Sequence, residues 1–139
     1  MKAFIDTNVV LDLLLKREPF FREARDIITI KDCDRTLDLI ISSVSVTNIA
    51  YIARKTGNVY DILESLTMIF DIAATDKKIV NQAIKLKWRD FEDAVQYCVA
   101  KEVNADVFIT RNVKDFKNVD GLRIWLPSDF LKFYSNTNK

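Results

Sequence analysis

Short apolar runs alternate along the chain with longer stretches in which apolar residues recur every three or four positions. The short runs are rich in Ile, Val and Phe, which predicts buried strands, and the longer stretches predict amphipathic helices. The expected strands are residues 2–5, 37–41, 70–74, 107–110 and 122–126. Because strands alternate with helices, we expect a three-layer α/β/α sandwich around a mostly parallel sheet.

Local boundary signals divide the helical stretches. Ser42 or Ser43 and Asp76 suit the N-cap position of a helix, Gly57-Asn58 suits a helix end, and Pro19 suits a first turn. The expected helices are residues 7–15, 19 to about 30, 43 to about 55, 59–69, 77 to about 87, 90–104 and a short last one that begins at 127. No low-complexity segment or linker separates these elements, so residues 1–139 are expected to form a single domain.

Composition bears on partners and compartment. A net charge of +1 argues neither for nor against nucleic acid, because a basic patch can be hidden in a neutral total. Cys33 and Cys98 stand alone without metal-ligand spacing, which is typical of a reducing compartment. The chain shows no signal-peptide pattern and no apolar run near the roughly 20 residues that span a bilayer. We therefore expect a cytoplasmic protein without membrane association.

The absence of histidine narrows the chemistry. Hydrolysis through a Ser-His-Asp triad, zinc sites built from histidine and ribonuclease chemistry with a histidine acid–base pair are all excluded. The only glycines are Gly57 and Gly121, so P-loops and dinucleotide-binding fingerprints are excluded as well. A site of carboxylates without histidine is typical of a hard cation such as Mg²⁺ or Mn²⁺.

Acidic side chains follow two of the expected strands and begin one of the expected helices. Asp6 follows the first strand, Asp115 lies just past the strand 107–110, and Asp93 lies at the start of the helix 90–104. In open α/β sheets, sites form beyond the carboxyl ends of the strands, at the point where the strand order reverses. We therefore expect Asp6 and the segment 110–115 to meet at one edge of the sheet.

Each of these acids also has a purely structural interpretation. Asp6 can cap the helix that follows it, and Asp90 can cap the next helix with Asp93 reaching back. Asp115 can belong to an ordinary polar turn. Glu92, between the two aspartates, is expected to face elsewhere on the helix.

Three segments, in this order and in a chain of this length, resemble the PIN-domain family, which includes VapC-like toxins and ribonucleases of the PilT N-terminus type. The segments are Asp6-Thr7-Asn8 after a strand, Phe91-Glu92-Asp93-Ala94 at a helix start, and Thr110-Arg111-Asn112-Val113-Lys114-Asp115-Phe116 after a late strand. The resemblance covers essentially the whole chain and implies a PIN-like fold. It also implies a metal-dependent endoribonuclease that cleaves single-stranded RNA with Mg²⁺ or Mn²⁺, and its catalytic and metal-binding acids would be Asp6, Asp93 and Asp115.

Other residues take lesser roles in this interpretation. Arg111 and Lys114 are expected to face the phosphates of the nucleic acid. Supporting polar roles are expected for Thr7, Asn8, Asn48, Asp90, Thr110 and Asn112. The resemblance further implies the toxin of a toxin–antitoxin pair, silenced by a small antitoxin protein, and pairing of the chain as a homodimer.

One position departs from the pattern that the resemblance implies. The family usually carries a Glu in the helix after the second strand, and Asn48 stands there in this chain. Asparagine can offer a neutral oxygen to a cation, but it brings no charge and cannot act as a base. The alternative is a catalytically weak or inactive PIN-fold module that binds nucleic acid. A phosphatase with an aspartyl nucleophile is disfavoured, because Asn8 stands where that chemistry needs a second aspartate.

Overall fold

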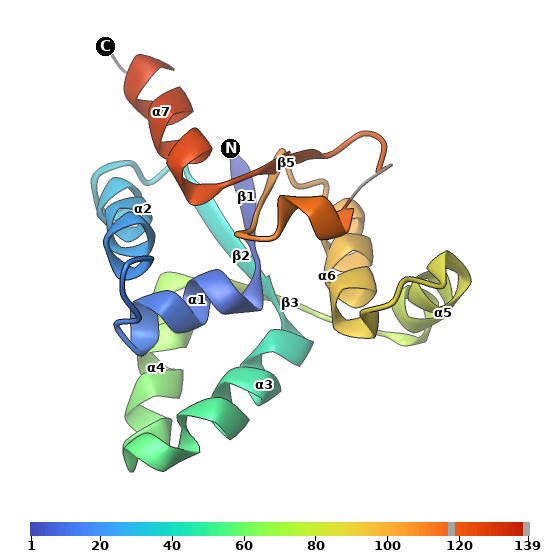
Figure 1. Cartoon of the computed structure of the whole chain (residues 1–139), viewed down its shortest axis with the longest axis horizontal. Helices are drawn as coiled ribbons and strands as arrows, with labels where there is room; N and C mark the ends of the chain where they lie inside the picture. The colour runs from blue at the N-terminus through green and yellow to red at the C-terminus, as the bar shows by residue number, and fades with distance from the viewer. Residues whose placement is uncertain (117–118, 138–139) are drawn as a thin grey trace.

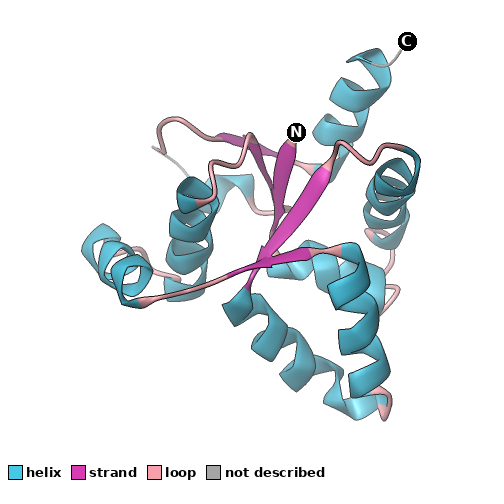
Figure 2. Ribbon diagram, turned by 180° about the vertical axis from the view of Figure 1, so that it is seen from behind, coloured by secondary structure: helices cyan, strands magenta, loops and turns pink. Residues whose placement is uncertain are grey.

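The computed structural model describes residues 1–116 and 119–137 and contains a five-stranded sheet with strand order β3-β2-β1-β4-β5. All four neighbouring strand pairs are parallel, and helices cover both faces of the sheet (Figures 1 and 2). The expected α/β/α sandwich is therefore confirmed. The strands are β1 (Lys2–Ile5), β2 (Asp38–Ser42), β3 (Asp71–Ala73), β4 (Val107–Ile109) and β5 (Arg123–Trp125).

Seven α-helices and two short 3₁₀ turns are present in the described residues. They are α1 (Thr7–Leu14), α2 (Phe21–Cys33), α3 (Ser43–Ala53), η1 (Arg54–Thr56), α4 (Val59–Ile69), α5 (Lys77–Leu86), α6 (Phe91–Glu102), η2 (Val113–Phe116) and α7 (Pro127–Thr137). None of these helices is both long and apolar enough to cross a bilayer, as far as the described residues show.

The predicted helix boundaries hold at most places. Ser42 caps α3 by accepting a hydrogen bond from the Ser45 N–H, and Asp76 caps α5 by accepting one from the Ile79 N–H. Gly57, with a φ of 80°, adopts the left-handed conformation that stops the helix after η1. The expected start of α2 at Pro19 is wrong by two residues, because this helix begins at Phe21.

The core has two layers because side chains alternate across the sheet. Ala3 and Ile5 of β1 pack in a cluster with residues of α1, α2 and α7, whereas Phe4 packs in a second cluster with residues of α5 and α6. Phe4 and Phe108 are both fully buried and stack with ring centroids 5.2 Å apart. This packing fixes β1 beside β4, and therefore fixes which residues meet where these two strands end.

Candidate metal and nucleic-acid site

The candidate site lies where β1 and β4 end, which is the switch point of the sheet. The chain adds β2 and β3 on one side of β1, then β4 and β5 on the other. Ile5 pairs with Ile109 in register, so Asp6 and Thr110 come next on neighbouring strands. The Thr110 hydroxyl donates a 2.7 Å hydrogen bond to Asp6 Oδ2. The two segments thus meet at the sheet edge as expected, and α1, α3 and α6 gather around the same end of β1 (Figure 1).

Asp6 is held firmly in this position. Its side chain is almost completely buried, and Gln96 Nε2 donates a 3.1 Å hydrogen bond to Asp6 Oδ1. The Thr7 N–H in turn donates to Gln96 Oε1 at 3.1 Å. Burial raises the pKa of Asp6, although the hydrogen bonds from Thr110 and Gln96 oppose the rise. Asp6 stands at the N-cap position of α1 but makes no capping hydrogen bond of its side chain, so capping alone does not explain it.

Asp93 lies in a strongly negative environment. Burial, followed by the charges of Asp6, Asp90, Asp115 and Glu92, raises its pKa to about 7. The Asp93 N–H donates a 3.1 Å hydrogen bond to Asp90 Oδ1, so Asp90 caps α6 as anticipated. The Asp93 carboxyl shares one electrostatic field with four other acids, which is a costly arrangement that a bound cation would relieve.

For the protein without metal, we expect the free energy of unfolding to decrease as pH rises from about 4 to about 7. In this window Asp93 holds its proton more tightly in the folded state than in the unfolded state, where its pKa is about 4. Raising the pH therefore removes a proton that favours folding. Because the side chain is partly exposed, solvent screening limits the loss to about 1–2 kcal/mol.

Urea unfolding at several pH values, with chelator present, measures this effect. Asp93→Asn should flatten the pH dependence and stabilise the metal-free protein at pH 8. Asp71→Asn, at an exposed position on β3, should leave the pH dependence as it is in the wild type. If the free energy of unfolding of Asp93→Asn decreased with pH as steeply as that of the wild type, Asp93 would not be the group that causes the pH dependence.

Glu92 occupies a place that the sequence did not indicate. The Asn48 side-chain amide donates a hydrogen bond to Glu92 Oε2. Burial raises the pKa of Glu92, with the Asn48 hydrogen bond opposing the rise and Asp6 adding to it. The expectation that Glu92 faces elsewhere on the helix is therefore wrong. Glu92 precedes Gln96 by four residues, so both lie on the face of α6 that Gln96 presents to Asp6.

Gln96 is a further site residue that sequence reasoning missed. It is only 1% exposed, and its side-chain amide bridges Asp6 and the backbone of Thr7. The available signal was an amide in an otherwise apolar stretch of α6, one turn after Glu92 and Asp93. A buried amide requires hydrogen-bond partners, which suggests a polar neighbour across the helix interface.

The segment after β4 forms a compact polar turn. The Asn112 N–H donates a 3.0 Å hydrogen bond to Thr110 Oγ1, and the Asp115 N–H donates to the Asn112 carbonyl at 2.9 Å. Asp115 and Lys114 are exposed on η2. Asn8, in the first turn of α1, is partly buried, and its backbone carbonyl accepts a hydrogen bond from Arg17.

Arg111 is engaged in an ion pair. Its Nε lies 2.7 Å from Asp12 Oδ2, and its guanidinium stacks over the Phe20 ring at 3.9 Å from the centroid. Arg17 Nε binds the other oxygen of Asp12 at 2.9 Å. Asp12 therefore ties the segment after β4 to α1. The predicted role of Arg111 in binding phosphate stays a prediction, and the geometry gives this residue a structural task as well.

The donor chemistry of the site suits a hard divalent cation. Carboxylates, a side-chain amide and a threonine hydroxyl are the oxygen ligands that Mg²⁺ and Mn²⁺ prefer. In the described part of the chain, however, no three acidic, cysteine or histidine side chains are placed so that together they could hold a metal ion. The acids share an electrostatic field without surrounding a common point, so binding a cation would draw their side chains together.

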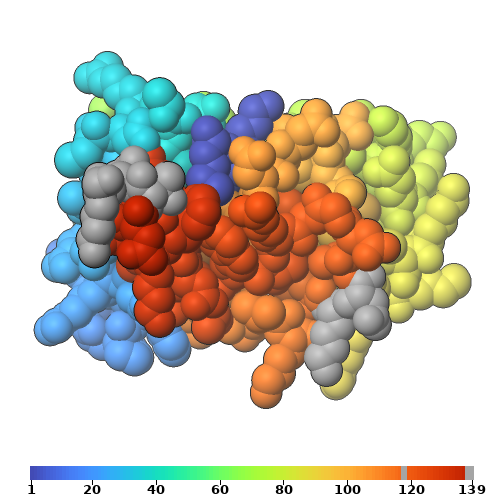
Figure 3. All heavy atoms as spheres, turned by 90° about the horizontal axis from the view of Figure 1, so that it is seen from above, coloured from blue at the N-terminus to red at the C-terminus, as the bar shows by residue number. Residues whose placement is uncertain are grey.

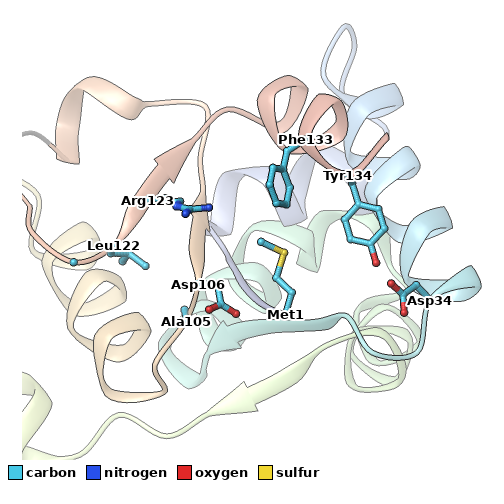
Figure 4. Close-up of a pocket in the computed structure, with 9 residues that line it drawn as sticks. Met1, Asp34, Ala105, Asp106, Leu122, Arg123, Phe133 and Tyr134 are labelled. Atoms are coloured by element: carbon cyan, nitrogen blue, oxygen red, sulfur yellow. The ribbon is translucent and has the colours of Figure 1, made fainter. Parts of the chain in front are cut away.

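A hollow lies at the opposite, amino end of the sheet. Met1, Arg123 and Tyr134 are among the residues that line it, and Asp34 and Asp106 add carboxylates (Figure 4). The N-terminal residues and the C-terminal helix are seen together on this face of the molecule (Figure 3). None of the predicted site residues lines this hollow.

Comparison with known proteins places the chain in a family. A family model described as "PIN domain" matches residues 2–114, and the chain therefore belongs to the PIN-domain family. The matched region includes Asp6 and Asp93 and ends one residue before Asp115. A search of curated proteins found no match.

Several solved structures share this fold. One, from a toxin–antitoxin complex of Klebsiella pneumoniae, is 25% identical with a TM-score of 0.68, and the match covers 90% of this chain and 97% of that one. Another, from VapBC-1 of nontypeable Haemophilus influenzae, is 21% identical with a TM-score of 0.70 and coverages of 92% and 99%. VapC20 of Mycobacterium tuberculosis, described as a sarcin-ricin loop cleaving toxin, is 11% identical with a TM-score of 0.61 and coverages of 76% and 86%.

Proposed function

We propose that this chain is a metal-dependent endoribonuclease that cleaves single-stranded RNA and acts as the toxin of a toxin–antitoxin pair. The observation that carries the proposal is the group of acids around Asp93 at the switch point of a PIN domain. The similar structures add support, because one comes from a toxin–antitoxin complex, another from VapBC-1, and VapC20 is described as a sarcin-ricin loop cleaving toxin.

In this proposal, some residues of the site bind the cation, others orient these ligands, and one attracts the RNA. Mg²⁺ or Mn²⁺, when bound, would activate water and offset charge on the phosphate. Thr110 and Gln96 hold the Asp6 carboxylate in one orientation, and each Asp6 oxygen keeps a lone pair for a cation. Asp93 and Asp115 contribute the other carboxylates. The exposed Lys114, next to Asp115, attracts the RNA backbone.

Cleavage of an end-labelled single-stranded RNA tests the proposal. Internal cuts are expected with Mn²⁺, at a rate at least about tenfold above that with chelator, because the acids cannot activate water without a cation. A duplex of the same sequence serves as the control substrate and should be cut more slowly. Cleavage that persists in chelator would contradict the metal dependence.

Asn48 favours a second candidate, which is a PIN-fold module that binds RNA but cuts it weakly or not at all. The neutral side chain removes one carboxylate from α3. A filter-binding measurement made on the same RNA separates the two candidates. Binding without cleavage, at any divalent metal, would support the module and overturn the nuclease.

Partner and assembly are part of the same proposal. We expect the chain to bind a small antitoxin protein and to pair as a homodimer, as a single domain in the cytoplasm. Light scattering of the purified chain, alone and with the product of a small neighbouring reading frame, measures both associations.

A further inference from the structure

We infer that Glu92 is the fourth carboxylate of the metal site and that Asn48 positions it, so that α6 supplies the charge that α3 lacks. This inference rests on the proposed function, since it assigns a ligand to the same site. In this inference Asn48 is not itself a ligand. Its side-chain amide holds the Glu92 carboxylate in the orientation in which Glu92 can bind the cation.

The rotation of α6 carries the first part of the argument. Gln96 Nε2 lies 3.1 Å from Asp6 Oδ1, which fixes the face of α6 that meets the end of β1. Glu92 lies one turn earlier on that same face, towards the helix start. Asp93 lies three residues before Gln96 and flanks Glu92. Two carboxylates therefore leave the first turn of α6 on the side where Asp6 is buried.

The contacts of Glu92 carry the second part. Asn48 reaches across from α3 and donates to Glu92 Oε2. A carboxylate has about four lone-pair positions, so this hydrogen bond orients Glu92 and still leaves oxygen capacity for a cation. Side chains that hold a ligand in this way commonly change metal affinity by about 10–100-fold when they are removed.

A tie between two helices is the competing explanation for the Asn48–Glu92 contact. If the pair only joins α3 to α6, its loss should lower the unfolding temperature and leave metal affinity unchanged. If Glu92 is a ligand, its loss should lower metal affinity first. Calorimetric titration with Mn²⁺ alone, beside thermal unfolding in chelator, separates the two explanations without depending on activity.

Glu92→Gln is expected to weaken Mn²⁺ binding by about 100-fold or more, because it removes a ligand and not only a residue that positions one. Asn48→Ala should weaken it by a smaller factor, and should have little further effect once Glu92→Gln is present, because Asn48 acts through the carboxylate. The double variant Asn48→Glu/Glu92→Gln exchanges amide and carboxylate across the same contact. It should bind Mn²⁺ more tightly than Glu92→Gln alone.

Two matched carboxylate-to-amide changes control this experiment. Asp90→Asn keeps the helix cap, since Asn caps as well as Asp, and removes a charge close to Asp93. It should weaken Mn²⁺ binding less than Glu92→Gln does. Glu102→Gln, at the far end of α6 and exposed beside Lys78, should bind like the wild type.

The results that overturn the inference differ from those that overturn the proposed function. Wild-type protein that binds no Mn²⁺ would end both. Wild type that binds Mn²⁺, with loss of affinity in Asp6→Asn but not in Glu92→Gln, would end the inference alone. Equal losses in Asp90→Asn and Glu92→Gln would also end it, because they would show an effect of total charge without a specific ligand.

Discussion

The Asp6→Asn variant is expected to lose at least about 10³-fold of the Mn²⁺-dependent RNA cleavage and still fold. Asp6 is the most buried acid of the site, and its two hydrogen bonds leave it little freedom to be replaced by another residue. The change to Asn removes a charge and a cation ligand with almost no change in volume. The loss of activity should therefore reflect chemistry and not packing.

The hydrogen-bond network around Asp6 can accept the new amide. Thr110 Oγ1 accepts from the Asn112 N–H and donates to Asp6, and it has a further lone pair. Turning its hydroxyl lets the substituted amide donate to it, while Gln96 keeps both of its bonds. The Thr110 hydroxyl then no longer donates a hydrogen bond to residue 6, which costs about 1 kcal/mol. Removal of a poorly solvated carboxylate offsets part of this cost.

Initial cleavage rates and thermal unfolding in chelator, measured on the same preparations, test this expectation. The unfolding temperature of Asp6→Asn should stay within a few degrees of the wild type. Asp71→Asn makes the same chemical change at an exposed position away from the site and should cleave normally. Full activity in Asp6→Asn would rule out a catalytic role for this carboxylate.

Most of the fold could be predicted from the sequence because its signals are local. Apolar runs such as residues 3–5 alternate with stretches of helical periodicity, and βαβ order leads to a parallel sheet. The meeting of Asp6 with Thr110 followed from the same reasoning, since neighbouring parallel strands end at a common edge. The start of α2 was misplaced because Pro19 fits either a turn or a first helical turn.

The details of the site could not be predicted because they depend on how α6 is rotated against β1. The spacing of Asp90, Glu92 and Asp93 fits several rotations, and only the contact between Gln96 and Asp6 selects one. This rotation of α6 places the Glu92 side chain against Asn48, which lies 44 positions earlier in the sequence. The sequence pattern of either helix alone cannot predict this pairing, because the contact forms only when α3 and α6 pack against the sheet.

The ion pair between Asp12 and Arg111 could not be predicted from local sequence patterns either, because the two residues are 99 positions apart. The sequence suggested only that Arg111 follows a strand and could face phosphate. In the fold, the Asp12 side chain is 2% exposed and binds both Arg17 and Arg111. A buried carboxylate with two cationic partners connects α1 to the segment that ends in Asp115.

We expect Asp12→Ala to lower the free energy of unfolding by about 2–4 kcal/mol. The change deprives Arg17 and Arg111 of their shared partner, and both guanidinium groups are partly buried. The arginines retain some access to water, which places the loss towards the lower end of the range for broken buried pairs. Chemical denaturation with chelator present measures the change.

Asp26→Ala provides the matched control for Asp12→Ala. Asp26 pairs with Arg25 at 3.3 Å, but both side chains are about half exposed, and such surface pairs contribute only about 0–1 kcal/mol. The control should therefore change stability by less than about 0.5 kcal/mol.

Because Asp12 anchors Arg111 beside Thr110 and Asn112, Asp12→Ala should also slow RNA cleavage at temperatures where the protein is folded. Equal stability of the two variants would show that the buried pair contributes nothing, and normal cleavage in Asp12→Ala would show that Arg111 does not hold the segment in place.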